Sequence, residues 1–236
     1  MRKLPQRSLL VRLLLFLVSA AGIAAFGHLV NDAADRDDDV RAGKANPLVT
    51  WTGGQIGLAI LGALVIGVVP WAFLDARPAA RAFLVIEPLL LVAYAVAPLR
   101  LKGRGMLGAV TDAAYAYAVP LVWTLTVFAA PGPLPQAVTA ALGAWALLAG
   151  LRAILWHQLE DLDGDRRVGA RTAAVRLGSE RTVRVVSGVL LPLEVVAAIV
   201  LVVLVAGDLP WLPWLVLGSI VWRLFQVSYL WGDRLL

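Results

Sequence analysis

The sequence predicts an all-α protein, a polytopic bundle of about seven transmembrane helices, and two observations carry this prediction. First, hydrophobic residues make up 60% of the 236 residues, charged residues only 16%, and the mean hydropathy is +0.80. Soluble domains are much less apolar than this. Second, several apolar segments reach the roughly 20 residues that a helix needs to cross about 30 Å of hydrocarbon. We therefore expect one integral-membrane domain over residues 1–236.

The predicted membrane helices follow one another with short connections and leave no room for a soluble domain. They cover residues 9–30, 55–73, 80–98, 106–130, 137–156, 182–206 and 212–230. The first follows the basic start MRKLPQR, but it is too long for a signal peptide and lacks a cleavage site, so we expect a retained helix. Glu87 and Glu194 lie close to prolines in the third and sixth segments, and we expect structural roles for both. The chain has no cysteine, which excludes disulfides, thiolate metal sites and a cysteine nucleophile.

Nine of the sixteen carboxylates are concentrated in two short clusters. Each cluster follows the C-terminal end of an apolar segment, the first segment in one case and the fifth in the other. Four membrane crossings separate these two ends, so we expect both clusters on the same side of the membrane. The clusters consist of Asp32, Asp35, Asp37, Asp38 and Asp39, and of Glu160, Asp161, Asp163 and Asp165.

The basic residues indicate which side that is. The loops on the side of the acidic clusters carry eleven Lys and Arg residues, whereas the opposite loops carry only Arg77 and Arg81. By the positive-inside rule, both clusters are predicted to be cytoplasmic. The net charge of +5 and the pI near 10.1 then reflect cytoplasmic loops, so we expect no nucleic-acid partner, and the sequence indicates no particular protein partner. This orientation places the basic N-terminus outside, a conflict that a further helix upstream would remove.

The spacing within the clusters favours a magnesium site. Asn31, Asp35 and Asp39 follow one another at four-residue intervals, as do Asp161 and Asp165, so each set lines one face of a helix. Carboxylates about 6 Å apart repel by about 3 kcal/mol at an effective dielectric constant near 20, so such a cluster requires cations. Hard oxygen ligands without His or Cys favour Mg²⁺ over zinc or copper.

Mg²⁺ is usually shared between carboxylates and substrate phosphate oxygens, and the interleaved cations also suit a phosphate. We therefore expect the two clusters to bind one diphosphate through Mg²⁺, with the lipid tail of that ligand buried between the helices. Asp37, Asp38 and Asp163 fall between the spaced positions and are expected to face solvent. The predicted phosphate-binding cations are Arg36, Arg41, Lys44, Arg166, Arg167 and Arg171.

At these residues the sequence resembles the UbiA-type intramembrane prenyltransferase family. The first signature of that family, NDxxDxxxD, is matched from Asn31 to Asp39, and the second, DxxxD, is matched by Asp161 and Asp165 and is followed by a basic stretch with Gly and Thr. The segments AGKANPL and PLRLKGRG also look like connecting loops of the family. The resemblance implies a helical bundle around a central cavity open to lipid. It assigns Mg²⁺ binding to Asn31, Asp32, Asp35, Asp39, Asp161 and Asp165.

The resemblance implies Mg²⁺-dependent transfer of an isoprenyl group from its diphosphate to a hydrophobic acceptor, most often an aromatic ring, as in the biosynthesis of prenylquinones and related lipids. Membrane lipids would surround the site. Family members typically have nine helices, and one of them precedes the helix that bears the first signature. Either this protein does without that leading helix, or the sequence starts downstream of it.

Further residues near the clusters are expected to act on the substrates. Asp35 and Asp165 are the predicted catalytic carboxylates. Asp112 lies early in the fourth segment, and an acid inside the membrane is a functional candidate that could orient the acceptor or take its proton. His157 borders the second signature and could contact phosphate or acceptor. An allylic carbocation could be stabilised by the faces of aromatic side chains. The candidates are Tyr115, Tyr117, Trp123 and Trp156.

Two other classes of protein remain as alternatives. The stretch DGDRRVGAR partly matches the signature of CDP-alcohol phosphotransferases, but the later spaced aspartates of that signature are missing. A non-catalytic transporter or scaffold could also bind cations through acidic clusters. Transporters tend to place coupling charges near the middle of the membrane, whereas these lie at helix ends. The acceptor itself, whether a quinone precursor, a chlorin-type ring or a glycerol lipid, stays open.

Overall fold

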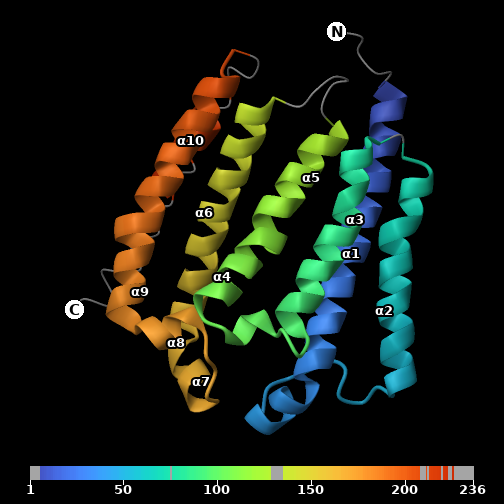
Figure 1. Ribbon diagram of the computed structural model, residues 1–236, viewed down its shortest axis with the longest axis vertical. Coiled ribbons are helices and arrows are strands. Elements are labelled where there is room, and N and C mark those ends of the chain that lie inside the picture. The colour runs from blue at the N-terminus through green and yellow to red at the C-terminus, as the bar shows by residue number, and fades with distance from the viewer. Residues whose placement is uncertain are drawn as a thin grey trace.

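The computed structural model describes residues 6–74, 76–128, 135–207, 211, 213–218, 220–222 and 225, and within these ranges it contains helices and no strand. Figure 1 shows long helices standing side by side. In chain order the elements are α1 (Gln6–Ala42), α2 (Gly53–Val68), η1 (Val69–Ala72), α3 (Pro78–Ala95), η2 (Leu101–Gly103), α4 (Met106–Ala113), η3 (Ala114–Ala118), α5 (Val119–Phe128), α6 (Gln136–Glu160), α7 (Leu162–Arg167), α8 (Ala173–Leu177), α9 (Ser179–Val185), η4 (Val186–Leu190) and α10 (Leu191–Val205).

The helices confirm the predicted fold class, an all-α membrane bundle. Five of them are long and apolar enough to cross a membrane: Leu9–Arg41, Gly53–Ala72, Pro78–Ala95, Gln136–Glu160 and Ser179–Val205. A further helical segment is formed by α4, η3 and α5, which run on from one another over residues 106–128, with a π-helical stretch in the middle. The seventh predicted segment, residues 212–230, lies largely outside the described residues, although the described residues from 213 to 222 are helical.

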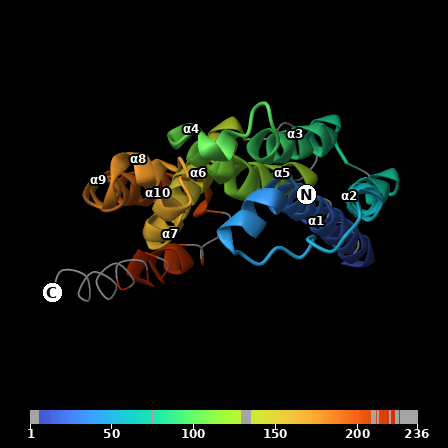
Figure 2. The same ribbon diagram turned by 90° about the horizontal axis from the view of Figure 1, so that it is seen from below.

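Most helices that follow one another in the chain also pack together, but α3 packs against α1 and not against α2. Helix α1 packs against both α2 and α3, α3 packs against α5, and α6 packs against α4, α5 and α10. Seen from the lower end of Figure 1, the row runs from α10 through α6, α5 and α3 to α1 and α2 (Figure 2). The C-terminal ends of α1 and α6 reach this same lower end, where α7 and α8 also lie. This arrangement brings the two acidic motifs together.

Small residues allow α1 and α2 to approach closely. A Cβ atom on Gly22 would collide with the backbone at Gly67, and such small-residue contacts are a common packing mode of membrane helices. Next to this contact, Ser19 donates to the carbonyl oxygen of Gly67 (2.5 Å) and accepts from Trp71 Nε1 (2.7 Å). The indole of Trp71 in turn stacks on Trp123. These contacts fix the half of the bundle that lies away from the acidic motifs.

One buried ion pair links two membrane helices. Arg152 of α6 donates through Nε to Glu194 Oε2 of α10 at 2.6 Å, and the Glu194 side chain is 1% exposed. This contact ties α10 to α6, in agreement with the structural role expected for Glu194. Glu87 is also buried, in the middle of α3 just before Pro88.

Candidate functional site

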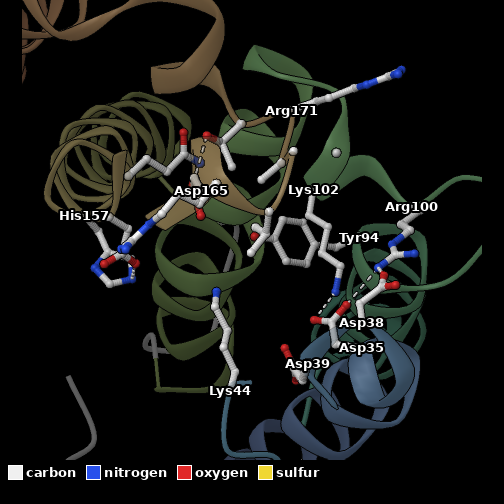
Figure 3. A pocket seen from close by; sticks show the side chains of 18 of the residues that line it. Asp35, Asp38, Asp39, Lys44, Tyr94, Arg100, Lys102, His157, Asp165 and Arg171 are labelled. Carbon is white, nitrogen blue, oxygen red and sulfur yellow. Dashed lines mark hydrogen bonds and ion pairs between the residues drawn. The ribbon is translucent and has the colours of Figure 1, made fainter. Parts of the chain in front are cut away.

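The two acidic motifs line one pocket of about 850 Å³ at the lower end of the bundle (Figure 3). Helix α1 contributes Asp35, Asp38 and Asp39, and the segment from α6 to α7 contributes Asp161 and Asp165. The two clusters thus lie at the same end of the bundle, as the prediction that they share one side of the membrane requires. Because α1 runs unbroken to Ala42, the first motif is helical throughout, and its four-residue spacing lines one face as expected.

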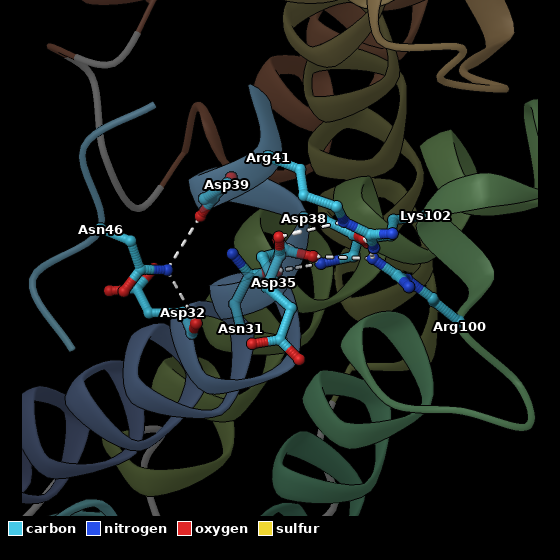
Figure 4. A network of polar contacts seen from close by, with 10 residues as sticks. Asn31, Asp32, Asp35, Asp38, Asp39, Arg41, Asn46, Arg100 and Lys102 are labelled. Atoms are coloured by element: carbon cyan, nitrogen blue, oxygen red, sulfur yellow. Dashed lines mark hydrogen bonds and ion pairs between the residues drawn. The ribbon is translucent and has the colours of Figure 1, made fainter. Parts of the chain in front are cut away.

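Two cations of the segment between α3 and α4 hold the first motif (Figure 4). Lys102 Nζ donates to Asp35 Oδ2 at 2.5 Å and to Asn31 Oδ1 at 2.9 Å. Arg100 Nη2 bridges Asp35 Oδ1 at 3.0 Å and Asp38 Oδ2 at 2.5 Å. Both oxygens of Asp35 thus face a positive charge. The site can accordingly hold cations at the positions where the sequence predicts a metal.

The environment shifts the pKa values of these two cations in opposite directions. The hydrogen bond to Asp38 is the main reason why the pKa of Arg100 is raised. Burial lowers the pKa of Lys102, and the hydrogen bond to Asp35 opposes this shift. Lys102 is therefore a partly desolvated ammonium group whose charged form is favoured by its hydrogen bond to Asp35.

A loop folds back under the end of α1 and positions Asp39. Asn46 is buried there, and its Nδ2 donates to Asp39 Oδ2 (2.8 Å) and to the carbonyl oxygen of Asp32 (2.9 Å). Its Oδ1 accepts from the backbone N–H of Leu48 at 2.9 Å. Asp32 itself does not line the pocket. It contacts this loop through its backbone carbonyl oxygen, which accepts from Asn46.

Replacement of Asn46 by Ala is expected to loosen this loop. Hydrogen bonds to a charged group contribute about 1.5–3 kcal/mol, so the variant should exchange the amide hydrogens of residues 44–50 about tenfold faster or more. Hydrogen–deuterium exchange measures this directly. Gln55→Ala is the matched control, because Gln55 bonds to Thr52 in the capping box of α2, outside this loop. Equal protection in wild type and Asn46→Ala would refute this role of Asn46.

The second motif is fixed by a threonine and a glycine. Thr172 caps the N-terminus of α8, and its Oγ1 also donates to Asp165 Oδ2 at 3.1 Å. Nearby, the backbone N–H of Gly105 donates to the carbonyl oxygen of Arg171 at 3.1 Å. Gly105 has a φ of +62°, a conformation that favours glycine, and an added Cβ would meet the Arg176 side chain. The basic segment of Arg100 and Lys102 is thereby joined to the loop that follows the second motif.

Four of the six predicted phosphate-binding cations line the pocket, and two do not. Arg41, Lys44, Arg167 and Arg171 are lining residues. Arg36 instead donates to the carbonyl oxygen of Val49 at 2.7 Å, and Arg166 lies 3.6 Å from Asp163. The structure therefore does not bring Arg36 and Arg166 to the pocket, because their positions on α1 and α7 direct them to other partners.

The expectation for the intervening aspartates holds for two of three. Asp37 is exposed, and the Asp163 side chain is 91% exposed. Asp38 differs, since it lines the pocket and accepts hydrogen bonds from Arg100 and Arg41. Helical spacing alone could not reveal this, because Arg100 arrives from a segment about sixty residues later in the chain.

Several residues in or beside the pocket are absent from the site predicted from the sequence. Arg100 and Lys102 lie in PLRLKGRG, and their one indication in the sequence is that this segment looks like a connecting loop of the family. Asn46 lies in AGKANPL, which also looks like such a loop. Tyr94 and Gln158 belong to no motif in the sequence, so no pattern indicates a role for them. In the structure Tyr94 lines the pocket, and Gln158 Oε1 accepts from the backbone N–H of Ala174 at 3.3 Å.

Asp112 lies next to the pocket rather than in its lining. Its Oδ1 accepts a hydrogen bond of 2.5 Å from the Tyr115 hydroxyl, and the Tyr115 ring contacts the ring of the lining residue Tyr94, with centroids 5.1 Å apart. His157 lines the pocket opposite, on α6, and its Nε2 lies 3.5 Å from Asp161 Oδ2. Of the four predicted cation-stabilising aromatics, Tyr115 is thus close to the site.

The other three aromatics are engaged elsewhere. Trp123 is 2% exposed in the aromatic core, where Trp71 and Phe83 stack on it. Trp156 donates to Glu160 at 2.9 Å near the end of α6. Tyr117 packs over Gly150 of α6. None of them lines this pocket.

The donor set of the pocket fits Mg²⁺ shared with a phosphate ligand. Among the described residues no three acidic or histidine side chains stand close enough to form a complete metal site by themselves. Mg²⁺ commonly takes only one or two carboxylates together with substrate phosphates and water, so two facing acidic walls suit it. The ammonium group of Lys102 between Asn31 and Asp35 shows that these oxygens can surround a cation.

Comparison with known proteins identifies a family, a relative and a solved structure that are similar to most of this chain. A family model, the UbiA prenyltransferase family, matches residues 4–234. A lycopene elongase/hydratase from Haloferax volcanii is 28% identical over 182 residues, which cover 73% of this chain and 54% of that protein, so the chain spans about half the length of this curated relative. Among solved structures, a UbiA homolog from Archaeoglobus fulgidus bound to DMAPP and Mg²⁺ superposes with a TM-score of 0.77 at 16% identity, covering 93% of this chain and 75% of that one.

Proposed function

The chain belongs to the UbiA prenyltransferase family, and we propose on this premise that it transfers an isoprenyl group from an isoprenyl diphosphate to an uncharged, apolar acceptor within the membrane. The observation that supports this most is the convergence of two carboxylate walls and several cations on one pocket at the end of a membrane bundle. A diphosphate needs both kinds of group, and its isoprenyl chain needs a surrounding of apolar helices.

In this proposal Mg²⁺ would be held at the diphosphate by Asn31, Asp35, Asp39, Asp161 and Asp165. When bound, Mg²⁺ would neutralise charge on the diphosphate and make it a better leaving group. Lys102 and Arg100 can turn from Asp35 toward the diphosphate oxygens, and Lys44, Arg41, Arg167 and Arg171 supply further positive charge around the pocket. The solved homolog that binds DMAPP and Mg²⁺ supports this donor class.

The acceptor is proposed to be an apolar polyene rather than the aromatic ring that the family resemblance suggests most often. The curated relative is named for lycopene, a polyene hydrocarbon. On the membrane side, the described site offers the phenols of Tyr94 and Tyr115, the aliphatic Ile154 and the carboxylate of Asp112. A negative charge at Asp112 disfavours an acidic aromatic acceptor by like-charge repulsion.

The proposal can be tested by supplying membranes that contain the protein with radiolabelled dimethylallyl diphosphate and MgCl₂, together with lycopene or with 4-hydroxybenzoate. We expect labelled hydrocarbon with lycopene only, and no consumption of donor when EDTA replaces MgCl₂. A labelled aromatic product would refute the acceptor class but keep prenyl transfer. Donor that is left intact with either acceptor would refute prenyl transfer itself.

The protein is an integral membrane protein of this family, and we propose that its pocket opens to the cytoplasm, as the distribution of Lys and Arg predicts. The absence of native cysteine permits a direct test with single cysteine variants. Asp163→Cys, at an exposed position beside the pocket, is expected to resist a membrane-impermeant maleimide in intact cells and to react after permeabilisation. Gln136→Cys, at the opposite end of α6, is expected to react in intact cells. The reverse pattern would overturn this orientation.

A further inference from the structure

Three polar side chains form a cluster on the hydrocarbon side of the pocket. Tyr115 donates its hydroxyl to Asp112, Tyr94 packs edge to face against Tyr115, and Tyr94 lines the pocket. Asp112 interacts with the Tyr94 hydroxyl as well, and it is within electrostatic range of His157 on α6. The cluster therefore joins α3, α4 and η3 at the place where the pocket meets the membrane interior.

The cluster lies deeper in the bundle than the cations do. Helix α4 begins at Met106, just after η2 with Lys102, and Asp112 follows six residues later. At 1.5 Å per residue, Asp112 stands about 9 Å further along the helix axis, toward the membrane interior. A diphosphate held at the level of Lys102 and Arg100 must direct its isoprenyl chain the same way, because only that direction is apolar. The reacting carbon of the donor then lies beside Tyr94 and Tyr115.

We propose that Asp112 is the catalytic base that removes the proton from the acceptor during prenyl transfer, with Tyr115 as its positioning residue. This inference rests on the proposed function. The phenol of Tyr115 fixes one carboxylate oxygen, and the hydroxyl of the lining residue Tyr94 also interacts with the carboxylate, so Asp112 is held beside the pocket. The ring faces of Tyr94 and Tyr115 stabilise positive charge on the reacting carbons through their quadrupoles.

The C–O bond of the donor breaks, and its electron pair leaves with the diphosphate. The π electrons of an acceptor double bond form the new C–C bond, which leaves a positive charge on the neighbouring carbon of the acceptor. Asp112 then takes a proton from the carbon next to that charge, and the C–H electron pair becomes a new double bond. Asp112 returns the proton to water when the pocket opens.

The other carboxylates of the site are less suited to this role. Asp35 and Asp38 are paired with Arg100, Lys102 or Arg41, and Asp165 accepts from Thr172. These groups face the position of the diphosphate. Within the membrane, Glu194 is bonded to Arg152 on another face of α6. Among the described residues, Asp112 differs from these carboxylates because its hydrogen-bond donor is a tyrosine hydroxyl beside the pocket.

The test uses the purified full-length protein in nanodiscs with MgCl₂, dimethylallyl diphosphate and lycopene. Asp112→Asn keeps the side-chain size and removes the base, so the rate of formation of the deprotonated, prenylated hydrocarbon is expected to fall about 10²-fold or more. The KM for dimethylallyl diphosphate should stay unchanged, since the diphosphate contacts are intact. Diphosphate release should continue with formation of a prenylated alcohol, because water adds to the coupled carbocation that is not deprotonated.

A hydrogen isotope effect separates a base from a structural residue. With perdeuterated lycopene, the isotope effect on product formation is expected to be larger in Asp112→Asn than in wild type, because proton removal becomes slower than the preceding steps. Asp112→Glu should restore part of the rate, and Tyr115→Phe should fall between wild type and Asp112→Asn. Glu160→Gln is the matched control, since this carboxylate bonds to Trp156 and does not line the pocket.

Several results would overturn the assignment. One is a normal product rate in Asp112→Asn. Another is an equal loss of diphosphate release and product with an unchanged isotope effect, which indicates a structural role. If the wild-type protein releases no diphosphate under these conditions, the proposed function is wrong. If it releases diphosphate without prenylating lycopene, the acceptor proposal is wrong and the base assignment falls with it.

Discussion

Asp35→Asn and Asp165→Asn are each expected to lower Mg²⁺-dependent release of diphosphate from dimethylallyl diphosphate by about 10²–10³-fold, the usual cost of one electrostatic contact to the reacting group. Each substitution removes one negative charge from a wall of the pocket and keeps the size and shape of the side chain. The loss should affect kcat more than the amount of protein in the membrane, because neither residue belongs to the apolar core of the bundle. A phosphate-release assay with purified protein measures it.

The chain supplies a matched control for each variant. Asp37→Asn and Asp163→Asn remove a carboxylate from the same two motifs, but both side chains are exposed and neither lines the pocket. We expect near wild-type release from both controls. Full activity of Asp35→Asn or Asp165→Asn would refute the metal assignment, and equal loss in all four variants would point to a general effect of the negative charge.

Lys102→Met is the second variant with a large expected effect. It should weaken binding of the diphosphate donor and strengthen binding of a divalent cation. Charged hydrogen bonds contribute about 1.5–3 kcal/mol, so loss of the ammonium group should weaken binding of a diphosphate donor about 10-fold to 100-fold. The same variant should bind a divalent cation more tightly without donor, because Lys102 no longer competes for Asn31 and Asp35. Mn²⁺ binding followed by electron paramagnetic resonance and calorimetry with dimethylallyl diphosphate measure the two affinities.

Arg104→Met is the control for this experiment. Arg104 belongs to the same basic segment, but it donates to the carbonyl oxygen of Pro98 at 2.9 Å and does not line the pocket. Both affinities should remain unchanged in this variant. If Lys102→Met binds Mn²⁺ as wild type does, competition between the lysine and the metal is excluded. If donor binding is also unchanged, Lys102 does not contact the diphosphate.

Much of the fold and half of the site could be predicted because they depend on local spacing. An apolar run of about 20 residues crosses a bilayer as a helix, because a helix satisfies all of its backbone hydrogen bonds internally. The four-residue intervals from Asn31 to Asp39 were visible in the sequence, and α1 continues through them as a helix. The resemblance to a family came from the same short intervals, and the family match confirms it.

Contacts between distant segments could not be predicted in this way. Whether Arg36 or Arg100 reaches Asp35 depends on the path of the loop after α3, and the sequence shows both only as basic residues near the end of an apolar segment. The π-helical stretch Ala114–Ala118 contains Tyr115, which contacts both Asp112 and Tyr94. The sequence does not predict this, because a hydropathy pattern does not show where one extra residue is inserted into a helical turn. Trp123 was a candidate by type, and packing against Trp71 and Phe83 placed it in the core.

Hydropathy and helical spacing are properties of neighbouring residues, so the amino-acid sequence alone predicts a membrane helix bundle with two oxygen-rich motifs at the same end. Which side chains share the pocket depends on tertiary contacts. Lys102 and Arg100 face the first motif because η2 joins α3 to α4 at that end, and Gly105 holds this segment against the loop of the second motif. The physical reason is that an ion pair or a hydrogen bond across the bundle requires two helices to bring their ends within about 3 Å, and no local pattern encodes that distance.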